Sequence, residues 1–279
     1  MPTAPTLPQP PIRVGIGGWT FEPWRGSFYP PGLPHDDELA YASRQLRVIE
    51  VNGTYYRLQS PATFARWHAQ APSGFVFSLK ASRVVTQRRV LAEAGEAVQR
   101  FVDSGLAELG DKLGPIVWQL PPTHRFEPDD LAAFFALLPQ KAGGLPLRHV
   151  LDPRHESFRS GEYLALARAH GITTVFTDGE DYPPIPDPTG PFVYARVMRT
   201  EPQNALGCTP EALDALAACA RAWQQGGEPT GLPRVDAAPA TGPGAPREVF
   251  LFFISAAKEK APLAARALQQ RVDALPPMA

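Results

Sequence analysis

A carboxylate interrupts one of the apolar runs of this chain. The stretch RVIEVNGTYYRL, residues 47–58, begins like a buried β-strand but carries Glu50 in its middle and Asn52 two residues later. Alternation along a strand places both side chains on one face with Val48. A carboxylate on a buried face has to be ion-paired, hydrogen-bonded or protonated, because burying it alone is costly. Glu50 is therefore a candidate general acid or base.

Three further apolar runs end in polar side chains. FVFSLK ends at Lys80, PIVWQL carries Gln119 near its end, and LRHVLD ends at Asp152, with Arg154 and His155 just behind it. We expect Lys80 and Arg154 to be the ionic partners of Glu50. A guanidinium in this position can bind an anion, and an imidazole can transfer protons. A purely structural ion-pair network is the competing interpretation.

The candidate site combines these residues with other polar groups that follow apolar runs. The candidate catalytic residues are Glu50, Lys80, Asp152 and His155. The candidate substrate-binding residues are Asn52, Tyr56, Arg57, Gln119, Arg154, Asp178 and Arg196. Carboxylates and imidazoles at Glu50, Asp152, His155 and Asp178 are also the types of group that bind metals, but no HxH or HExxH spacing supports this. We expect no metal and no other cofactor.

The elements that must position these residues alternate regularly between β and α patterns. Short β-rich runs alternate with amphipathic helical runs, which is typical of βα units on a parallel sheet. The expected strands are 12–18, 47–51, 75–80, 115–120, 147–152, 172–178, 192–197 and 248–255. The expected helices are 36–45, 60–70, 93–110, 128–138, 161–170, 210–225 and 258–273.

Eight strands with seven helices in 279 residues match a (β/α)8 barrel of the TIM type. The segment after the sixth strand has no room for a helix, so one helix should be missing. A doubly wound open sheet is the alternative, because a strand count does not show closure. In a barrel the candidate residues would meet at the carboxyl ends of the strands, which is the catalytic face of this architecture.

Composition limits the domain organisation. Proline makes up 33 residues and falls mostly between apolar segments, where it marks loops and helix starts. We expect a disordered Pro-rich tail at 1–11 and a single barrel domain at 12–275, with a flexible Pro/Gly-rich loop at 227–247.

Charge and apolar patterning limit the partners and the location. The formal net charge is −1, so no global field favours nucleic acid, although a local basic patch is not excluded by this count. No signal peptide or membrane span is visible, and the two cysteines form neither a disulfide framework nor a zinc motif. We expect a cytoplasmic protein whose partner is a small, anionic ligand; the sequence leaves the oligomeric state open.

Five motifs resemble, in order and spacing, the YecE-like family, known as domain of unknown function 72. They are GIGGWTFEPWRGSFYPPGLP, IEVNGTYYRLQSPATFARW, GFVFSLKASR, LGPIVWQLPP and DPRHESF. The resemblance implies a TIM-type barrel, and it supplies a site without an established reaction.

The chain departs from the family pattern at three places. The resemblance implies Glu where this chain has Asp152, His where it has Met198, and an Asn-containing FNN where it has FIS with Ile254 and Ser255. Such losses imply a changed substrate or a lost activity.

These observations lead to one functional hypothesis with two alternatives. The first is an acid–base enzyme without a redox cofactor, a hydrolase, lyase or isomerase, acting on a small anionic substrate such as a phosphorylated sugar. Glu50 would transfer the proton with His155 as a second carrier, and Arg154 and Arg196 would hold the anion. The alternatives are a non-catalytic binding protein that uses the same pocket and a metal-dependent phosphodiesterase or nuclease.

Overall fold

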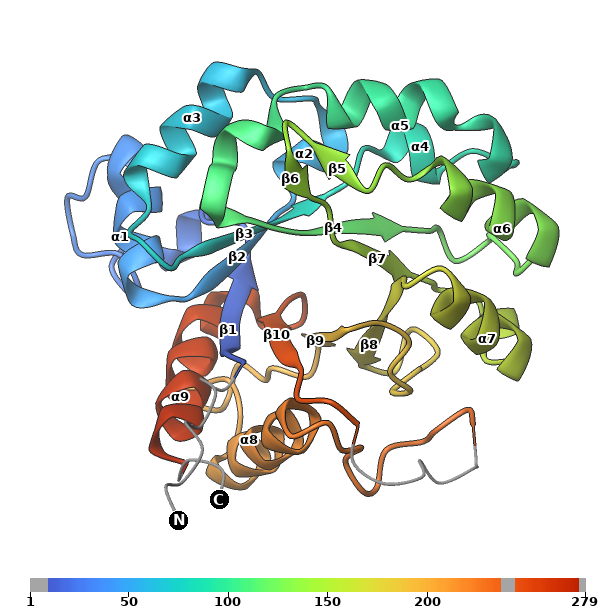
Figure 1. Cartoon of the computed structure of the whole chain (residues 1–279). Coiled ribbons are helices and arrows are strands. Elements are labelled where there is room, and N and C mark those ends of the chain that lie inside the picture. The colour runs from blue at the N-terminus through green and yellow to red at the C-terminus, as the bar shows by residue number, and fades with distance from the viewer. Residues whose placement is uncertain (1–9, 237–243, 276–279) are drawn as a thin grey trace, which may run out of the picture.

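The protein is a closed barrel of parallel strands surrounded by helices (Figure 1). A computed structural model describes residues 10–236 and 244–275. Within these ranges eight strands close in the order β1-β10-β9-β8-β7-β4-β3-β2, so the first and last strands pair. The TIM-type barrel is confirmed, and the open sheet is excluded because β1 lies between β10 and β2. The barrel strands are β1 Ile12–Gly17, β2 Val48–Val51, β3 Val76–Lys80, β4 Leu113–Gln119, β7 His149–Asp152, β8 Thr173–Asp178, β9 Phe192–Val197 and β10 Glu248–Phe253.

Helices follow the strands in the order that the amphipathic pattern predicts. Ser60 and Thr209 cap the N-termini of their helices, since each side chain accepts a hydrogen bond from the backbone N–H three residues later. The helices are α1 Glu38–Gln45, α2 Gly53–Tyr56, α3 Pro61–Gln70, α4 Arg83–Thr86, α5 Gly95–Val102, α6 Pro128–Leu137, α7 Gly161–Ala169, α8 Pro210–Gln224 and α9 Ala261–Ala274. A small hairpin of β5 Lys141–Ala142 and β6 Leu145–Pro146 lies outside the barrel.

One expected helix was wrong in its extent. The segment expected to be a single helix over 93–110 is divided into α5 and a 3-10 segment at Leu106–Lys112. Gly105 separates the two with a φ of 108°, a conformation that ends an α-helix and that glycine adopts without strain. Amphipathic periodicity continued across this break, which is why the pattern did not reveal it.

The expected absence of a helix after the sixth barrel strand is confirmed for residues 179–191, all of which are described. Residues 179–191 form a loop that contacts the described part of the 227–247 segment. Asp187 in the loop is buried and accepts hydrogen bonds from the backbone N–H groups of Val235 and Asp236. Residues 237–243 of that segment and 1–9 of the expected tail lie outside the described residues.

Side chains fill the barrel lumen in alternation along each strand. An inner apolar cluster contains Val48, Val76, Val117, Val150, Val175, Phe192, Tyr194, Phe250 and Phe252. Two residues further along the same strands, toward their carboxyl ends, lie Glu50, Ser78, Gln119, Asp152, Thr177 and Arg196, and Lys80 lies two residues beyond Ser78. The apolar cluster therefore supports a polar layer at the carboxyl-terminal mouth, where enzymes of this architecture do chemistry.

Candidate functional site

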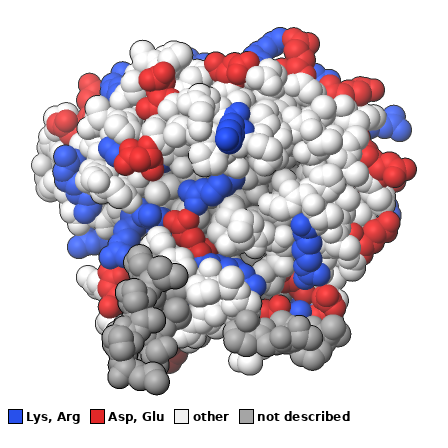
Figure 2. All heavy atoms as spheres, in the orientation of Figure 1, with Lys and Arg blue, Asp and Glu red and all other residues white. Residues whose placement is uncertain are grey.

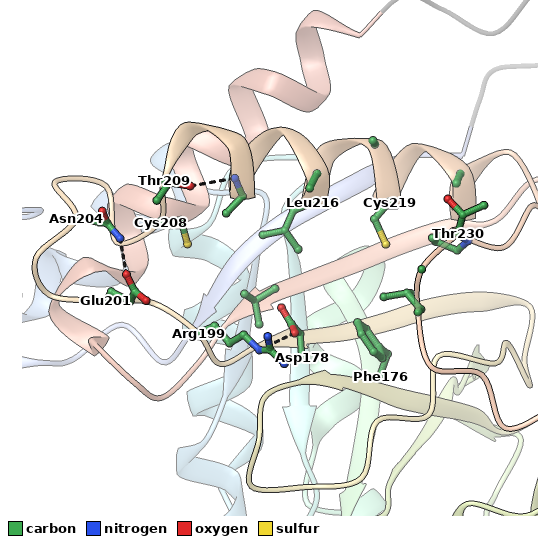
Figure 3. A pocket seen from close by; sticks show the side chains of 18 residues that line it. Phe176, Asp178, Arg199, Glu201, Asn204, Cys208, Thr209, Leu216, Cys219 and Thr230 are labelled. Carbon is green, nitrogen blue, oxygen red and sulfur yellow. Dashed lines mark hydrogen bonds and ion pairs between the residues drawn. The ribbon is translucent and has the colours of Figure 1, made fainter.

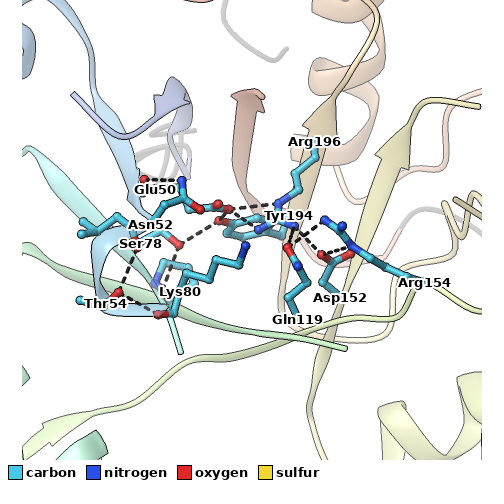
Figure 4. Close-up of polar contacts among 12 residues, drawn as sticks. Glu50, Asn52, Thr54, Ser78, Lys80, Gln119, Asp152, Arg154, Tyr194 and Arg196 are labelled. Carbon is cyan, nitrogen blue, oxygen red and sulfur yellow. Dashed lines mark hydrogen bonds and ion pairs between the residues drawn. The ribbon is translucent and has the colours of Figure 1, made fainter. Parts of the chain in front are cut away.

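A buried arginine joins two carboxylates at the bottom of the mouth (Figure 4). Arg196 on β9 donates from Nε and Nη2 to Oε2 of Glu50, at 3.1 and 2.7 Å. Its Nη1 donates to Oδ2 of Asp152 on β7 and, at 3.2 Å, to Oε1 of Gln119. All its guanidinium nitrogens are therefore engaged inside the protein. The expectation that Lys80 and Arg154 pair with Glu50 was wrong, because Arg196 occupies that role.

Glu50 points into the lumen, as alternation along β2 predicted. It is 1% exposed and also accepts a hydrogen bond of 2.6 Å from the Tyr194 hydroxyl. Burial alone raises the pKa of Glu50, but Arg196, Tyr194 and Lys80 outweigh burial and hold that pKa below its usual value. All the hydrogen bonds of its carboxylate go to Oε2; Oε1 is buried and has no hydrogen-bond partner among the described residues.

Lys80, at the end of β3, has an unusual environment for a lysine. Its Nζ has no carboxylate within ion-pair distance among the described residues, and it lies 4.3 Å from the centre of the Tyr55 ring. The pKa of Lys80 is lowered to about 8, mainly by burial and also by the positive charges of Arg196 and Arg154, which outweigh the opposite effect of Glu50 and Asp152. The pKa of this amine therefore lies within about one to two units of neutral pH, whereas an ordinary lysine has a pKa of about 10.4.

Arg154 lies on the loop after β7, beside this network. Its Nε donates to Asp152 at 3.1 Å and its Nη2 donates to Gln119 at 2.8 Å, while its guanidinium stacks 4.1 Å from the centre of the Tyr182 ring. These contacts leave Nη1 without a hydrogen bond among the described residues. Arg154 is therefore oriented by the protein and still has a donor available for a ligand.

A pocket of about 600 Å³ opens above the network. Its volume falls within the usual range for small-molecule sites. Trp19, Trp24 and Ile254 contribute apolar surface, and Lys258 adds a further cation, with its Nζ 4.4 Å from the centre of the Phe21 ring. The candidate residues that line the pocket are Glu50, Asn52, Tyr56, Lys80, Gln119, Arg154 and Arg196.

The remaining candidates do not line this pocket. Asp152 lies beneath it in the network, at 1% exposure. His155 caps the short 3-10 turn at Glu156–Phe158, where its Nδ1 accepts a hydrogen bond of 3.1 Å from the backbone N–H of Ser157. Arg57 follows α2 and is exposed.

Asp178 is placed in a different pocket, between β8, β9 and α8 (Figure 3). Val175 faces the lumen, so alternation turns Asp178 to the outside of the barrel, where it pairs with Arg199 at 3.0 Å. The pocket has a volume of about 650 Å³ and is lined largely by apolar residues such as Phe176, Leu216 and Cys219.

The metal-binding alternative finds no converging donors. Among the described residues, no group of three or more His, Cys, Asp or Glu side chains is arranged to hold a metal ion. Two of the four donors considered from the sequence, Glu50 and Asp152, share Arg196, and the other two, His155 and Asp178, point elsewhere.

Tyr194 is a residue of the polar network that the sequence interpretation missed. Its hydroxyl donates to Glu50 and lies 2.9 Å from Oγ of Ser78, while its ring stacks on Phe252 with centres 4.8 Å apart. The run FVYARV contained the necessary signal, because Tyr194 and Arg196 are two residues apart and so share the lumen face.

The backbone at the end of β10 is strained. Ser255 and Ala256 both have left-handed conformations, with φ values of 66° and 47°. Ser255 lines the mouth pocket beside Ile254. Consecutive left-handed residues other than glycine are costly, and such strain is found preferentially at functional sites.

The fold and the site together define a TIM-type barrel with a polar, mainly basic pocket at the carboxyl ends of its strands. Comparison with known proteins then gives the family. The sequence profile described as "Protein of unknown function DUF72" matches residues 13–278. The chain belongs to this family, as the five sequence motifs implied.

Individual relatives are distant. UPF0759 protein YecE of Escherichia coli K12 is 27% identical over 142 residues, which cover 50% of this chain and 48% of the relative. UPF0759 protein YunF of Bacillus subtilis is 22% identical over 169 residues, covering 57% and 58%. The match thus spans about half the length of these curated relatives.

Solved structures agree in fold over almost the full chain. A DUF72 family protein from Thermotoga maritima superposes with a TM-score of 0.71 at 21% identity, covering 94% of this chain and 99% of the other. A DUF72 family protein from Enterococcus faecalis gives a TM-score of 0.67 at 15% identity, covering 95% and 97%. At these identities the likeness shows the fold alone. No helix in the described residues is long and apolar enough to cross a membrane.

Proposed function

We propose that the protein is an acid–base enzyme that acts on a small anionic substrate in the mouth pocket. The observation that carries the proposal is Lys80: its amine faces this pocket without a carboxylate partner, and its pKa of about 8 lies close to neutral pH. A proton-transfer group works best when its pKa is near the working pH. Lys80 is therefore the proton carrier in this proposal.

The roles of the neighbouring groups follow from their contacts. Glu50, which the sequence suggested as the acid or base, is assigned instead as the counter-ion of Arg196, because it accepts three hydrogen bonds on one oxygen and its pKa is lowered. The anion is assigned to Arg154 rather than to Arg196, because among the described residues Nη1 of Arg154 has no hydrogen bond, whereas all three guanidinium nitrogens of Arg196 donate. Gln119 holds Arg154 and Arg196 through its oxygen, so its amide NH₂ is free to orient the substrate.

Charge supports an anionic substrate. The pocket and the network below it contain four basic side chains, Lys80, Arg154, Arg196 and Lys258, against the two carboxylates of Glu50 and Asp152. This excess is local. Over the face shown in Figure 2, Lys and Arg side chains alternate with Asp and Glu side chains rather than forming one large basic field. A small anion fits this pattern better than a polyanion, whose binding depends on many basic contacts.

The test begins with binding. Thermal unfolding is followed in the presence of small carboxylates, sugar phosphates and nucleotides, and a ligand at a hundred times its dissociation constant adds about 2.7 kcal/mol to the free energy of unfolding. Arg154→Ala should lose the response to anions. Arg57→Ala is the control, since Arg57 is exposed and outside the pocket.

Catalysis is tested on the ligands that bind. Proton NMR in D₂O follows turnover or exchange of carbon-bound hydrogen for each stabilising ligand. Lys80→Met should reduce the rate by about 10²-fold or more while the ligand still stabilises the variant.

Ligand binding without any turnover or exchange would favour the alternative of a non-catalytic binding protein. One observation supports that alternative: Ile254, which is apolar, and Ser255 form part of the pocket wall, where the family resemblance implies an asparagine.

A further inference from the structure

We propose that Lys80 acts as a nucleophile: its Nζ forms an imine with the carbonyl group of a small keto or aldehyde substrate that also carries a carboxylate or phosphate. This inference rests on the proposed function for the place where the substrate binds. It adds a covalent step and narrows the substrate class to carbonyl compounds.

The contacts of the mouth leave this amine free. A lysine beside two buried carboxylates would ordinarily form an ion pair with one of them. Here Arg196 occupies both, donating to Glu50 at 2.7 Å and also to Asp152, and Arg154 donates to Asp152 as well. Within the described part of the chain, Nζ of Lys80 has instead an aromatic contact, with the Tyr55 ring, and no ion pair. An amine held in this way keeps its lone pair available when it loses its proton.

The surroundings also favour the unprotonated amine. Proteins activate an imine-forming lysine by burying it or by placing another cationic group beside it. Both conditions hold for Lys80: burial is the larger cause of its lowered pKa, and the guanidinium groups of Arg196 and Arg154 lower the pKa as well. The buried carboxylates keep the arginines in place without pairing with the lysine.

The backbone fixes where the amine stands. Lys80 is the last residue of β3, and its carbonyl oxygen accepts a hydrogen bond of 2.7 Å from Thr54, whose hydroxyl also lies 3.0 Å from the carbonyl oxygen of Val51 at the end of β2. Thr54 is 1% exposed. The stem of Lys80 is therefore anchored between two strands, and the side chain enters the pocket from a rigid position.

The other groups required for the reaction line the same pocket. Arg154 can hold the carboxylate or phosphate through its free nitrogen, and the free amide NH₂ of Gln119 can donate to a substrate oxygen. Oε1 of Glu50, in the pocket floor, is buried without a hydrogen-bond partner among the described residues. This oxygen can therefore accept a hydrogen bond from a substrate hydroxyl or from the iminium N–H.

The step balances without an oxidant or reductant. The lone pair of neutral Nζ forms a bond to the carbonyl carbon while the carbonyl π electrons move to oxygen, which takes up a proton. The resulting carbinolamine loses that oxygen as water, and the nitrogen loses both of its hydrogens overall. One amine and one carbonyl compound thus give one imine and one water.

Reductive trapping tests the inference directly. The full chain is incubated with pyruvate, glyoxylate or dihydroxyacetone phosphate and sodium cyanoborohydride, and intact mass and peptide mapping follow. We expect one of these probes to add the mass of one ligand less one oxygen atom, at Lys80, at least tenfold faster than at any other lysine. Arg154→Ala should slow trapping of the anionic probes but not of acetone.

The controls separate reactivity from folding. Lys80→Arg keeps a positive charge but cannot form an imine, and Lys80→Met removes the charge; both should lose the fast adduct while retaining the circular dichroism spectrum of the wild type. Lys141→Met, on the exposed hairpin outside the pocket, should trap like the wild type. Equal labelling of all lysines, or labelling at Lys258 in place of Lys80, overturns the inference.

The result is distinguishable from the test of the proposed function. If Lys80→Met abolishes ligand turnover but the wild type gives no adduct, Lys80 transfers protons and forms no imine. If Lys80 is trapped rapidly but no ligand is turned over, the imine inference stands and the proposed catalytic function fails.

Discussion

Arg196 on β9 and Glu50 on β2 meet across the barrel lumen, where Nε and Nη2 of the arginine both donate to one carboxylate oxygen, at 3.1 and 2.7 Å. The two residues are 146 positions apart in sequence. Because Arg196 pairs with Glu50, the Nζ amine of Lys80 has no ion-pair partner in the part of the chain that the structure describes. The chemistry of the mouth thus depends on this contact.

Removal of Arg196 should destabilise the protein strongly. Arg196→Met leaves Glu50 and Asp152 buried without a cation, and breaking a buried ion pair from one side costs about 3–5 kcal/mol. Urea unfolding monitored by tryptophan fluorescence measures the loss. The control is Arg199→Met, which removes a partly exposed pair with Asp178 and should cost less than about 1 kcal/mol. Similar losses in the two variants would contradict a structural role for the network.

Loss of Lys80 should stabilise the folded protein at pH 7. The folded state holds this amine at a pKa of about 8, mainly by burial, against about 10.4 in an unfolded chain. At pH 7 the amine is mostly protonated in both states, so the folded state bears most of the cost of the buried charge. Lys80→Met should therefore raise the free energy of unfolding by about 1–3 kcal/mol at pH 7, where the lower end allows for the partial exposure of the side chain; its attraction to Glu50 and Asp152 is already contained in this pKa.

The pH dependence of that difference gives the sign test. Between pH 8 and about 10.4 the folded state loses the proton of Lys80 while the unfolded chain keeps it. The contribution of Lys80 therefore makes the wild type more stable as the pH rises, and the difference in free energy of unfolding between Lys80→Met and the wild type becomes smaller. Arg154, Arg196, Glu50 and Asp152 are the charged groups around Lys80. Urea titrations at pH 7 and 9.5 compare the variants. An advantage that grows with pH would rule out a depressed pKa.

Ala256→Gly should stabilise the protein by about 0.5–1 kcal/mol. The residue has a φ of 47°, which costs an L-residue about 1–2 kcal/mol that glycine does not incur, and part of this gain is offset by the greater backbone entropy of glycine when unfolded. Ala257→Gly is the matched control, because its φ of −74° carries no such strain. It should lose stability in the same thermal unfolding assay. A loss in both variants would mean that the strain is absent in solution.

Gly15→Ala should be poorly tolerated. Gly15 lies on β1, and a Cβ there would come within 1.9 Å of the carbonyl oxygen of Val48 on the neighbouring strand. Because backbone atoms must move to relieve this contact, the free energy of unfolding should fall by at least about 2 kcal/mol. Gly161→Ala, at the start of α7, meets no atom within 4 Å and should be neutral or slightly stabilising. A neutral Gly15→Ala would indicate a different register between β1 and β2.

Local sequence patterns were sufficient for most of the fold. Eight β-rich runs alternating with amphipathic runs predicted the barrel strands to within two residues at each end, because alternation and helical periodicity are properties of neighbouring residues. The same alternation predicted that Glu50 enters the lumen. The break at Gly105 was not predicted, since its conformation leaves the hydrophobic spacing on either side unchanged.

Sequence alone determined the family, the strand order along the chain and the gathering of polar residues at the strand ends. Only the tertiary structure decided which of those residues share a pocket. Asp178 faces the outside of the barrel, His155 caps a 3-10 turn, and Glu50 forms its ion pair with Arg196 instead of Lys80. The physical reason is that ion pairs here form across the lumen between strands far apart in sequence. Their partners depend on barrel closure and on the register of each strand, which short-range patterns do not encode.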